Sequence, residues 1–128
     1  MKKIILLFGL LLIFSGAFSQ NKQITTIVEQ TELLADTINI GMGNYSGPWG
    51  LIVETFSLDA ADAQIKIQVA YSTTSKWVDF ASASTLDLPA DSATGFEHGF
   101  LLYRYVRLVV IPNSVTLGDY KVTLFTLE

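Results

Sequence analysis

The rest of the chain is organised around the apolar stretch at residues 101–112, LLYRYVRLVVIP. Successive side chains of a strand point to opposite faces, and here both faces would be apolar apart from Arg104 and Arg107. A strand of this kind is typical of the centre of a sheet that is covered on both sides, so we predict a long central strand at about residues 100–111. We interpret the two arginines and Pro112 as residues that discourage aggregation between strands.

Residues 63–71 show the clearest alternation of apolar and polar positions. The apolar side chains are expected to face the core and the polar ones to face water. The inward positions are Ile65, Ile67, Val69 and Tyr71. A polar turn at 59–62 separates this stretch from an apolar one at 51–58, and we predict that the two form a hairpin with one wet face.

Other stretches rich in β-branched residues predict further short strands. They cover residues 24–29, 77–80, 85–89 and 120–127. Residues 33–40 leave two alternatives open, a strand or a helical turn. Residues 41–50 contain four glycines and a proline and are expected to form a loop, as are residues 90–99. About seven or eight short strands, with no long helical period, predict an all-β fold: an antiparallel β-sandwich of the jelly-roll kind.

The N-terminus has the three parts of a secretory signal. A basic start at Lys2 and Lys3 precedes an uncharged apolar run at 4–14 and a stretch of mostly small residues. We predict cleavage before Gln20, so that residues 1–19 are a signal peptide and residues 20–128 a single domain. A membrane anchor is the alternative, but the apolar run is shorter than the roughly 20 residues that a span needs.

Charge and cysteine content limit which cellular compartments and which binding partners suit this chain. The chain has 8 basic and 12 acidic residues, and loss of Lys2 and Lys3 with the signal would leave 6 against 12, a net charge of −6. Such a chain is unsuited to nucleic acid or to anionic membranes. It has no cysteine, so disulfides and thiolate chemistry are excluded. We expect an exported protein of bacterial or phage origin, in the periplasm, on the cell surface, outside the cell or on a virion.

Catalytic chemistry is hard to build from these residues. His98 is the only histidine, which excludes sites with several histidine ligands, and no serine lies in a G-x-S-x-G context. Asp59 and Asp62 form an Asp-x-x-Asp turn, a pattern that usually caps the local backbone. Calcium is an alternative that the acidic turn residues leave open, although such residues are usually only solvated. These residues are Asp59, Asp62, Asp87 and Asp91. We therefore expect no enzyme activity, no cofactor and no metal site.

The aromatic residues of the glycine-rich loop are the best candidates for ligand binding. Tyr45 and Trp49 could form an exposed platform for a sugar or another protein, with His98 as a further contact from its own loop. The alternative for Trp49 is a packing residue at the edge of the sandwich. Trp77 follows a polar turn and is expected to pack against the sheet.

Two segments resemble the discoidin-type, galactose-binding-like β-sandwich family. Residues 71–79, YSTTSKWVD, are similar to the family's strand, serine turn and tryptophan, and residues 103–108, YRYVRL, resemble its tyrosine–arginine strand. Short secreted or virion-associated proteins of Bacteroidota and their phages look similar. The turn reads Thr73-Thr74-Ser75 where the family commonly has Asp-Gly after the serine. The resemblance implies a non-enzymatic module and transfers no site residue.

From the sequence we predict a non-enzymatic exported structural or assembly protein of a surface or virion particle, which would bind its own copies or another surface or virion protein. The alternative is a carbohydrate- or cell-surface-binding module, whose partner would be a glycan.

Overall fold

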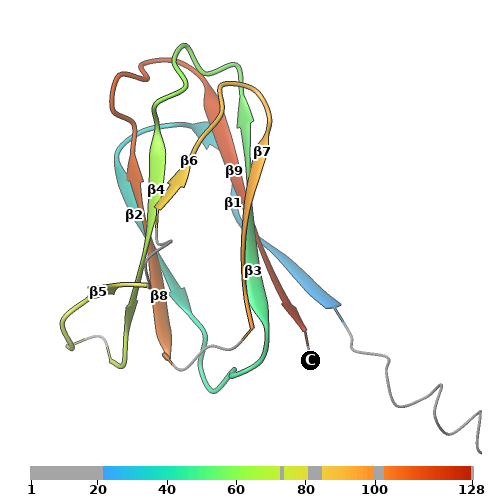
Figure 1. The fold of residues 1–128 in the computed structure, drawn as a ribbon, viewed down its shortest axis with the longest axis vertical. Helices are drawn as coiled ribbons and strands as arrows, with labels where there is room; N and C mark the ends of the chain where they lie inside the picture. Colours follow the sequence, from blue (N-terminus) through green and yellow to red (C-terminus); the bar gives the residue numbers. More distant parts are fainter. Residues whose placement is uncertain (1–21, 73, 81–84, 100–102, 128) are drawn as a thin grey trace, which may run out of the picture.

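The described part of the chain is an all-β sandwich (Figure 1). The computed structural model describes residues 22–72, 74–80, 85–99 and 103–127. They form nine strands: β1 (Lys22–Glu32), β2 (Asp36–Gly41), β3 (Trp49–Phe56), β4 (Gln64–Ala70), β5 (Val78–Asp79), β6 (Thr85–Asp87), β7 (Ala93–His98), β8 (Tyr105–Ile111) and β9 (Asp119–Leu127). Within these residues no helix is long and apolar enough to cross a membrane.

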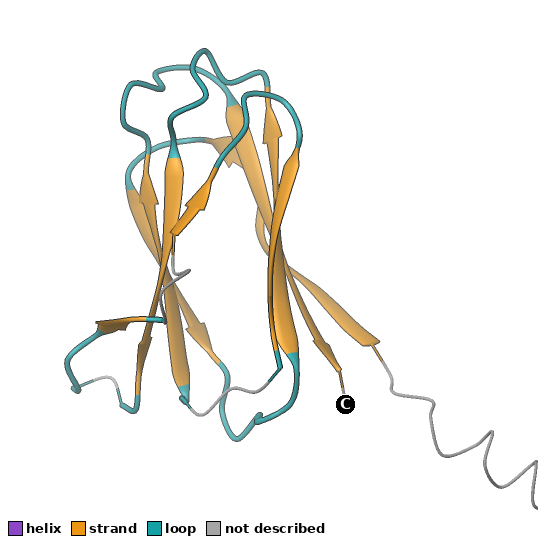
Figure 2. Ribbon diagram, viewed as in Figure 1, coloured by secondary structure: helices purple, strands orange, loops and turns teal. Residues whose placement is uncertain are grey.

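The strands make two antiparallel sheets that stack face to face, with loops at both ends (Figure 2). Sheet A has the order β1-β9-β3-β7. Sheet B has the order β2-β8-β4-β5, and β6 also pairs with β4. The predicted antiparallel sandwich is therefore confirmed. The predicted signal at residues 1–19 lies outside the described residues.

Side chains alternate between buried and partly exposed positions along β4 and β8, and the buried ones form the part of the core that sheet B contributes. Ile65, Ile67 and Val69 of β4 point inward, as predicted, and each is at most 1% exposed. The same prediction was wrong for Tyr71, which follows the end of β4 and is 64% exposed. On β8 the inward side chains are Val106, Leu108 and Val110, and these are also buried. Residues of sheet A with no exposed surface lie opposite: Leu51, Val53 and Val122. Removing this apolar area from water is the main favourable contribution to folding.

Strand β8 is central, as predicted, but it is covered on one face only. It pairs with β2 on one side and β4 on the other. Its outward side chains are partly exposed: Tyr105, Arg107, Val109 and Ile111. The prediction of cover on both faces was wrong because sheet A stacks against only one face of sheet B. The strand also begins at Tyr105, and residues 100–102 of the predicted strand lie outside the described residues.

The predicted hairpin at residues 51–71 was also wrong. Strand β3 pairs with β7 and β9 in sheet A, whereas β4 lies in sheet B. The polar turn between them crosses from one layer to the other, and Ser57 adopts a positive φ of 53° there. A local pattern of strand, turn and strand cannot distinguish such a crossing from a hairpin, because packing between the layers decides it.

Two further segments resolve what the sequence left open or missed. Within residues 33–40, the strand alternative is correct, because Asp36–Gly41 form β2 at an edge of sheet B. The predicted loop at residues 90–99 instead contains β7, which pairs with β3. Gly95 gives this strand a poor β-propensity, and pairing along β3 overrides that preference.

Two aspartates hold the loop between β8 and β9. The Asp59 carboxylate accepts hydrogen bonds from Thr116 N (2.9 Å), Thr116 Oγ1 (2.5 Å) and Leu117 N (3.1 Å). The Asp62 carboxylate accepts one from Ser114 Oγ at 2.6 Å. Both residues cap backbone groups, but the expectation that they cap their own turn was wrong, because the capped groups belong to the loop between β8 and β9. The described residues contain no group of three or more acidic or histidine side chains that could hold a metal.

The Asp59 contacts predict an acid-dependent loss of stability. Hydrogen bonds from Thr116 and Leu117 lower the pKa of Asp59 in the folded chain. A lowered folded pKa means that the stabilisation is complete above the unfolded value, about 3.9, and is lost as the pH falls through the folded value. Asp59→Asn should therefore reduce the free energy of unfolding at pH 7. The difference in this free energy between Asp59→Asn and the unchanged chain should shrink below about pH 4.

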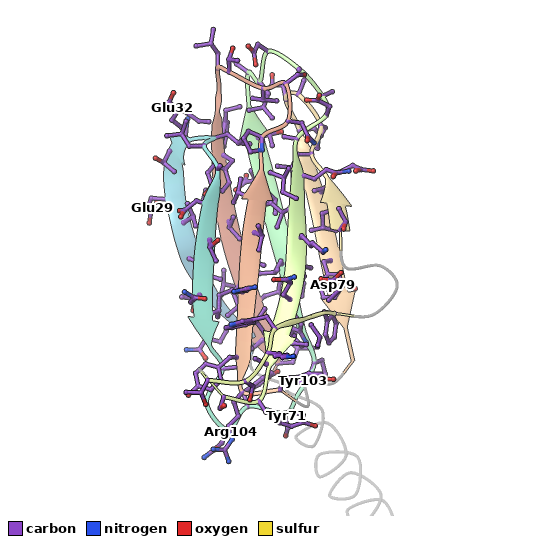
Figure 3. All side chains as sticks on the ribbon, turned by 90° about the vertical axis from the view of Figure 1, so that its left-hand side faces the viewer. Glu29, Glu32, Tyr71, Asp79, Tyr103 and Arg104 are labelled. Atoms are coloured by element: carbon purple, nitrogen blue, oxygen red, sulfur yellow. The ribbon has the colours of Figure 1, made fainter. Side chains whose placement is uncertain are left out.

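Urea unfolding across the pH range measures this difference. Glu29→Gln, which removes an exposed carboxylate of β1 (Figure 3), controls for the loss of one negative charge. A difference for Asp59→Asn that stays constant from pH 7 to pH 2 would contradict the account.

Candidate functional site

Trp49 is the first residue of β3 and not part of the loop before it. Its side chain is 1% exposed, and its ring packs against Phe80 and Phe96 at centroid distances of 5.6 and 5.3 Å. The buried Nε1 has no hydrogen-bond partner among the described residues. Glycines on both sides of the Pro48–Trp49 pair suggested a loop. The buried ring instead fits the alternative that Trp49 is a packing residue, and it does not form an exposed platform.

Tyr45 fastens the glycine-rich loop to the end of β9. Its hydroxyl lies within hydrogen-bonding distance of the carbonyl oxygens of Pro48 and Leu127, the latter at 2.8 Å, and accepts a hydrogen bond from Leu127 N at 3.0 Å. The polar end of the side chain is therefore occupied by backbone groups. His98 ends β7 opposite Trp49 and so lies in a strand, not in the predicted loop. That these three residues bind a ligand stays a prediction, and the site below is built from others.

The outer face of sheet B brings together four polar residues from four strands. Strand register places Asn39 of β2 opposite Arg107 of β8, and Arg107 opposite Gln68 of β4. Gln68 lies in turn opposite Asp79 of β5. Asn39, Gln68 and Arg107 project away from the core because their neighbours along each strand point into it, whereas both residues of β5, Asp79 included, are exposed. The sheet therefore presents one continuous polar row across its width.

Hydrogen bonds fix most of this row in place. Arg107 Nε donates to Gln68 Oε1 at 2.7 Å, and Gln68 Nε2 donates to Asp79 Oδ1 at 2.8 Å. Lys66 Nζ pairs with Asp79 Oδ2 at 2.8 Å. These two donors, Lys66 first, lower the pKa of Asp79 and keep it ionised. Figure 3 shows Asp79 at the side of sheet B where β5 lies.

Trp77 lies over the guanidinium group of Arg107. The distance from Arg107 Cζ to the centre of the indole ring is 4.5 Å, which is within the range of a cation–π interaction. The serine turn before it is held by hydrogen bonds between Ser72 and Ser75, including 2.7 Å between their hydroxyl oxygens. Trp77 therefore packs on the sheet, as predicted, but on its outer face and with its side chain only partly buried.

A groove of about 390 Å³ lies beside this pair. Its lining comprises Thr37, Asn39, Ile40, Gly41, Trp77, Tyr105 and Arg107. A second hollow of about 310 Å³ adjoins it through Gly41 and Tyr105, and Arg104 and Asn44 also line that hollow. The two hollows give an aromatic wall, amide and hydroxyl groups and two guanidinium groups on one surface. Such a surface suits a polar ligand with an apolar ring face.

Another hollow, of about 280 Å³, is lined by residues that include Trp49, Glu97 and Phe125. It offers little aromatic surface from Trp49, whose side chain is 1% exposed. The sheet B groove is therefore the stronger candidate site.

One feature of the sequence points to this site, although we interpreted it above as protection against aggregation. Arg107 interrupts an apolar strand at an outward position, and an arginine placed there can serve a ligand as well as discourage aggregation. Its partners Trp77, Gln68 and Asn39 are up to 68 residues away from it in the chain. The register of three strands shows that Asn39 and Gln68 meet Arg107, and the cation–π contact shows that Trp77 does.

Comparisons with solved structures give the fold. The chain is similar to the SPBc2 prophage-derived protein YomS, with 19% identity, a TM-score of 0.54 and coverage of 84% of this chain and 94% of that chain. A weaker likeness, with a TM-score of 0.47 and 10% identity, covers 83% of this chain and 99% of the C-terminal CBM6 of LamC from Zobellia galactanivorans. An equally weak one, TM-score 0.47 and 10% identity, covers 85% of this chain and 90% of a Bacillus endospore appendage protein. No protein-family model and no curated protein sequence matches the chain.

The two tryptophans should report their different environments in fluorescence. Trp77→Phe leaves only the buried Trp49, whose emission should be blue-shifted and poorly quenched by acrylamide. Trp49→Phe leaves only the partly exposed Trp77, which should be quenched several-fold more strongly. Equal quenching of the two variants, with both folded by circular dichroism, would contradict these placements.

Proposed function

We propose that this chain is a non-enzymatic carbohydrate-binding module that acts outside the cytoplasm, with the groove on the outer face of sheet B as its site. The observation that carries the proposal is the Trp77–Arg107 pair, fixed at 4.5 Å beside a groove of about 390 Å³. Its volume lies within the range of about 300–1,000 Å³ that is typical of small-molecule sites. The galactose-binding-like resemblance of residues 71–79 and 103–108 is consistent with it.

The chemistry of the lining suits a sugar. A pyranose ring has an apolar face that packs on an aromatic side chain, and its rim of hydroxyl groups needs planar donors and acceptors. Trp77 supplies the first, and Asn39 and Arg107 supply the second. Because Gln68 already holds the arginine, little side-chain freedom is lost when a ligand binds.

The groove lacks the groups that sugar cleavage requires. Glycoside hydrolysis ordinarily uses two carboxyl groups on either side of the scissile bond. No carboxylate of the described part of the chain lines the groove, and Asp79, at the end of the polar row, is engaged by Lys66 and Gln68. Recognition without catalysis therefore fits this surface best. Export depends on the predicted signal at residues 1–19 and is part of the same proposal.

A specific feature favours self-assembly as a second function. Strand β1 is eleven residues long, lies at the edge of sheet A and pairs with β9 along one side only. A long edge strand offers backbone groups to a strand from another copy. Figure 3 shows Glu29 and Glu32 on β1, where their charge would oppose such pairing. The half of β1 nearer its start instead carries Ile24, which is 63% exposed.

Replacement of the groove tryptophan should weaken sugar binding. Trp77→Ala removes the aromatic wall, and loss of a central aromatic contact usually costs more than 1 kcal/mol, so we expect affinity to fall about fivefold or more. A panel of neutral and acidic oligosaccharides, screened on a microarray and then measured by calorimetry, tests this. Ile52→Ala, on the outer face of sheet A, is the control and should keep full affinity. Unchanged affinity of folded Trp77→Ala would refute the site.

Assembly through β1 makes a separate prediction. Light scattering after size exclusion on residues 20–128, over a dilution series, should show a discrete oligomer, and Ile24→Lys should convert it to a monomer. A monomer for the unchanged chain at every concentration would refute assembly and leave the binding proposal intact.

A further inference from the structure

Two arginines of this acidic chain line the groove and the hollow that adjoins it, Arg107 in the first and Arg104 in the second. The whole chain has a formal net charge of −4. Among the described cationic side chains, those on sheet B or on the loops at one end of it are Lys66, Lys76, Arg104 and Arg107, while Lys121 lies on sheet A. Figure 3 shows Arg104 at that end, together with Tyr71 and Tyr103. The groove is therefore a basic surface on a chain that otherwise repels anions.

Arg107 is arranged to receive a planar anion. Its Nε is used by Gln68, and its face is covered by Trp77, so the plane of the guanidinium group is set before a ligand arrives. Its terminal nitrogens form no hydrogen bond or ion pair with a described residue. Two parallel N–H groups at the end of a guanidinium match the two oxygens of a carboxylate.

Nearby acidic side chains do not neutralise this arginine. The ion pairs that involve described residues are Lys66 with Asp79 and Lys121 with Glu54. Asp79 lies beyond Gln68, on the side away from Asn39 and the groove. Among the described residues, no aspartate or glutamate lines the groove or the hollow that adjoins it. An anionic group would thus meet an unopposed positive charge.

The geometry points to a uronic-acid-containing saccharide as the ligand of this groove. The carboxylate of one sugar binds the terminal nitrogens of Arg107, its ring lies beside Trp77, and the chain continues past Tyr105 toward Arg104. This inference rests on the proposed function and names its ligand class. An acidic peptide could supply the same carboxylates, and its backbone could pair with the Asn39 amide, but its acidic side chains have no apolar ring face to pack on the indole wall, so a saccharide is favoured.

Calorimetry with matched ligands tests the inference on the purified protein. The ligands are oligomers of galacturonate, glucuronate and mannuronate, each beside its carboxyl-reduced counterpart, with polyglutamate as a charge control. At least one uronate oligomer should bind, its reduced counterpart at least about tenfold more weakly. Arg107→Gln should lower the affinity for the uronate oligomer by about the same factor. The affinity of Arg107→Lys should lie between those of the unchanged chain and Arg107→Gln, and Arg104→Gln should lose less affinity than Arg107→Gln. Lys121→Gln removes a positive charge from sheet A and should keep full affinity.

Each other outcome has a definite meaning. Equal affinity for acidic and reduced oligomers would overturn the inference and leave the proposed function standing. Binding of polyglutamate as strong as that of the uronates would overturn it too, since the surface would then recognise charge alone. Full affinity in folded Arg107→Gln would also overturn it. Binding of no saccharide of any kind would remove the proposed function as well.

Discussion

The register of β8 between its two neighbours is the constraint on which the rest of this structure depends. Val106, Leu108 and Val110 must face sheet A, because a shift of one residue would expose all three and bury Arg107. Once they do, Arg107 has to project from the opposite face, between Asn39 and Gln68. The same apolar burial that stabilises the sandwich therefore positions the basic group of the candidate site.

The two ends of the sandwich serve different purposes. At one end, Asp59 and Asp62 fasten a loop that is more than 50 residues away in the chain, and their hydrogen bonds are used up in doing so. At the other end, the serine turn carries Trp77 back over the sheet, where its ring still has exposed surface. Fixed polar groups close the first end, whereas at the second they prepare a surface that a ligand can use.

The sequence predicted what depends on local alternation and missed what depends on distant contacts. The fold class and the inward residues of β4 follow from a period of two, which a strand with one covered face imposes. The crossing after β3 and the strand Ala93–His98 do not follow from this period. Packing between the layers decides the crossing, and pairing with β3 decides the strand. Trp49 stands between glycines and resembled a loop residue, yet its apolar ring is buried. Trp77 and Arg107 are 30 residues apart, and no local pattern joins them.

The central claim is that the outer face of sheet B binds a saccharide. The chemical shifts of backbone amides and of tryptophan indole N–H groups, followed by nuclear magnetic resonance while the best-binding saccharide is added, test it most directly. The account predicts that the largest changes fall on Asn39, Arg107 and the indole N–H of Trp77, since these groups lie together on the outer face of sheet B. It also predicts little change in the buried indole N–H of Trp49. Changes concentrated at residues 45–49, or along β1, would contradict it and place the ligand elsewhere on the sandwich.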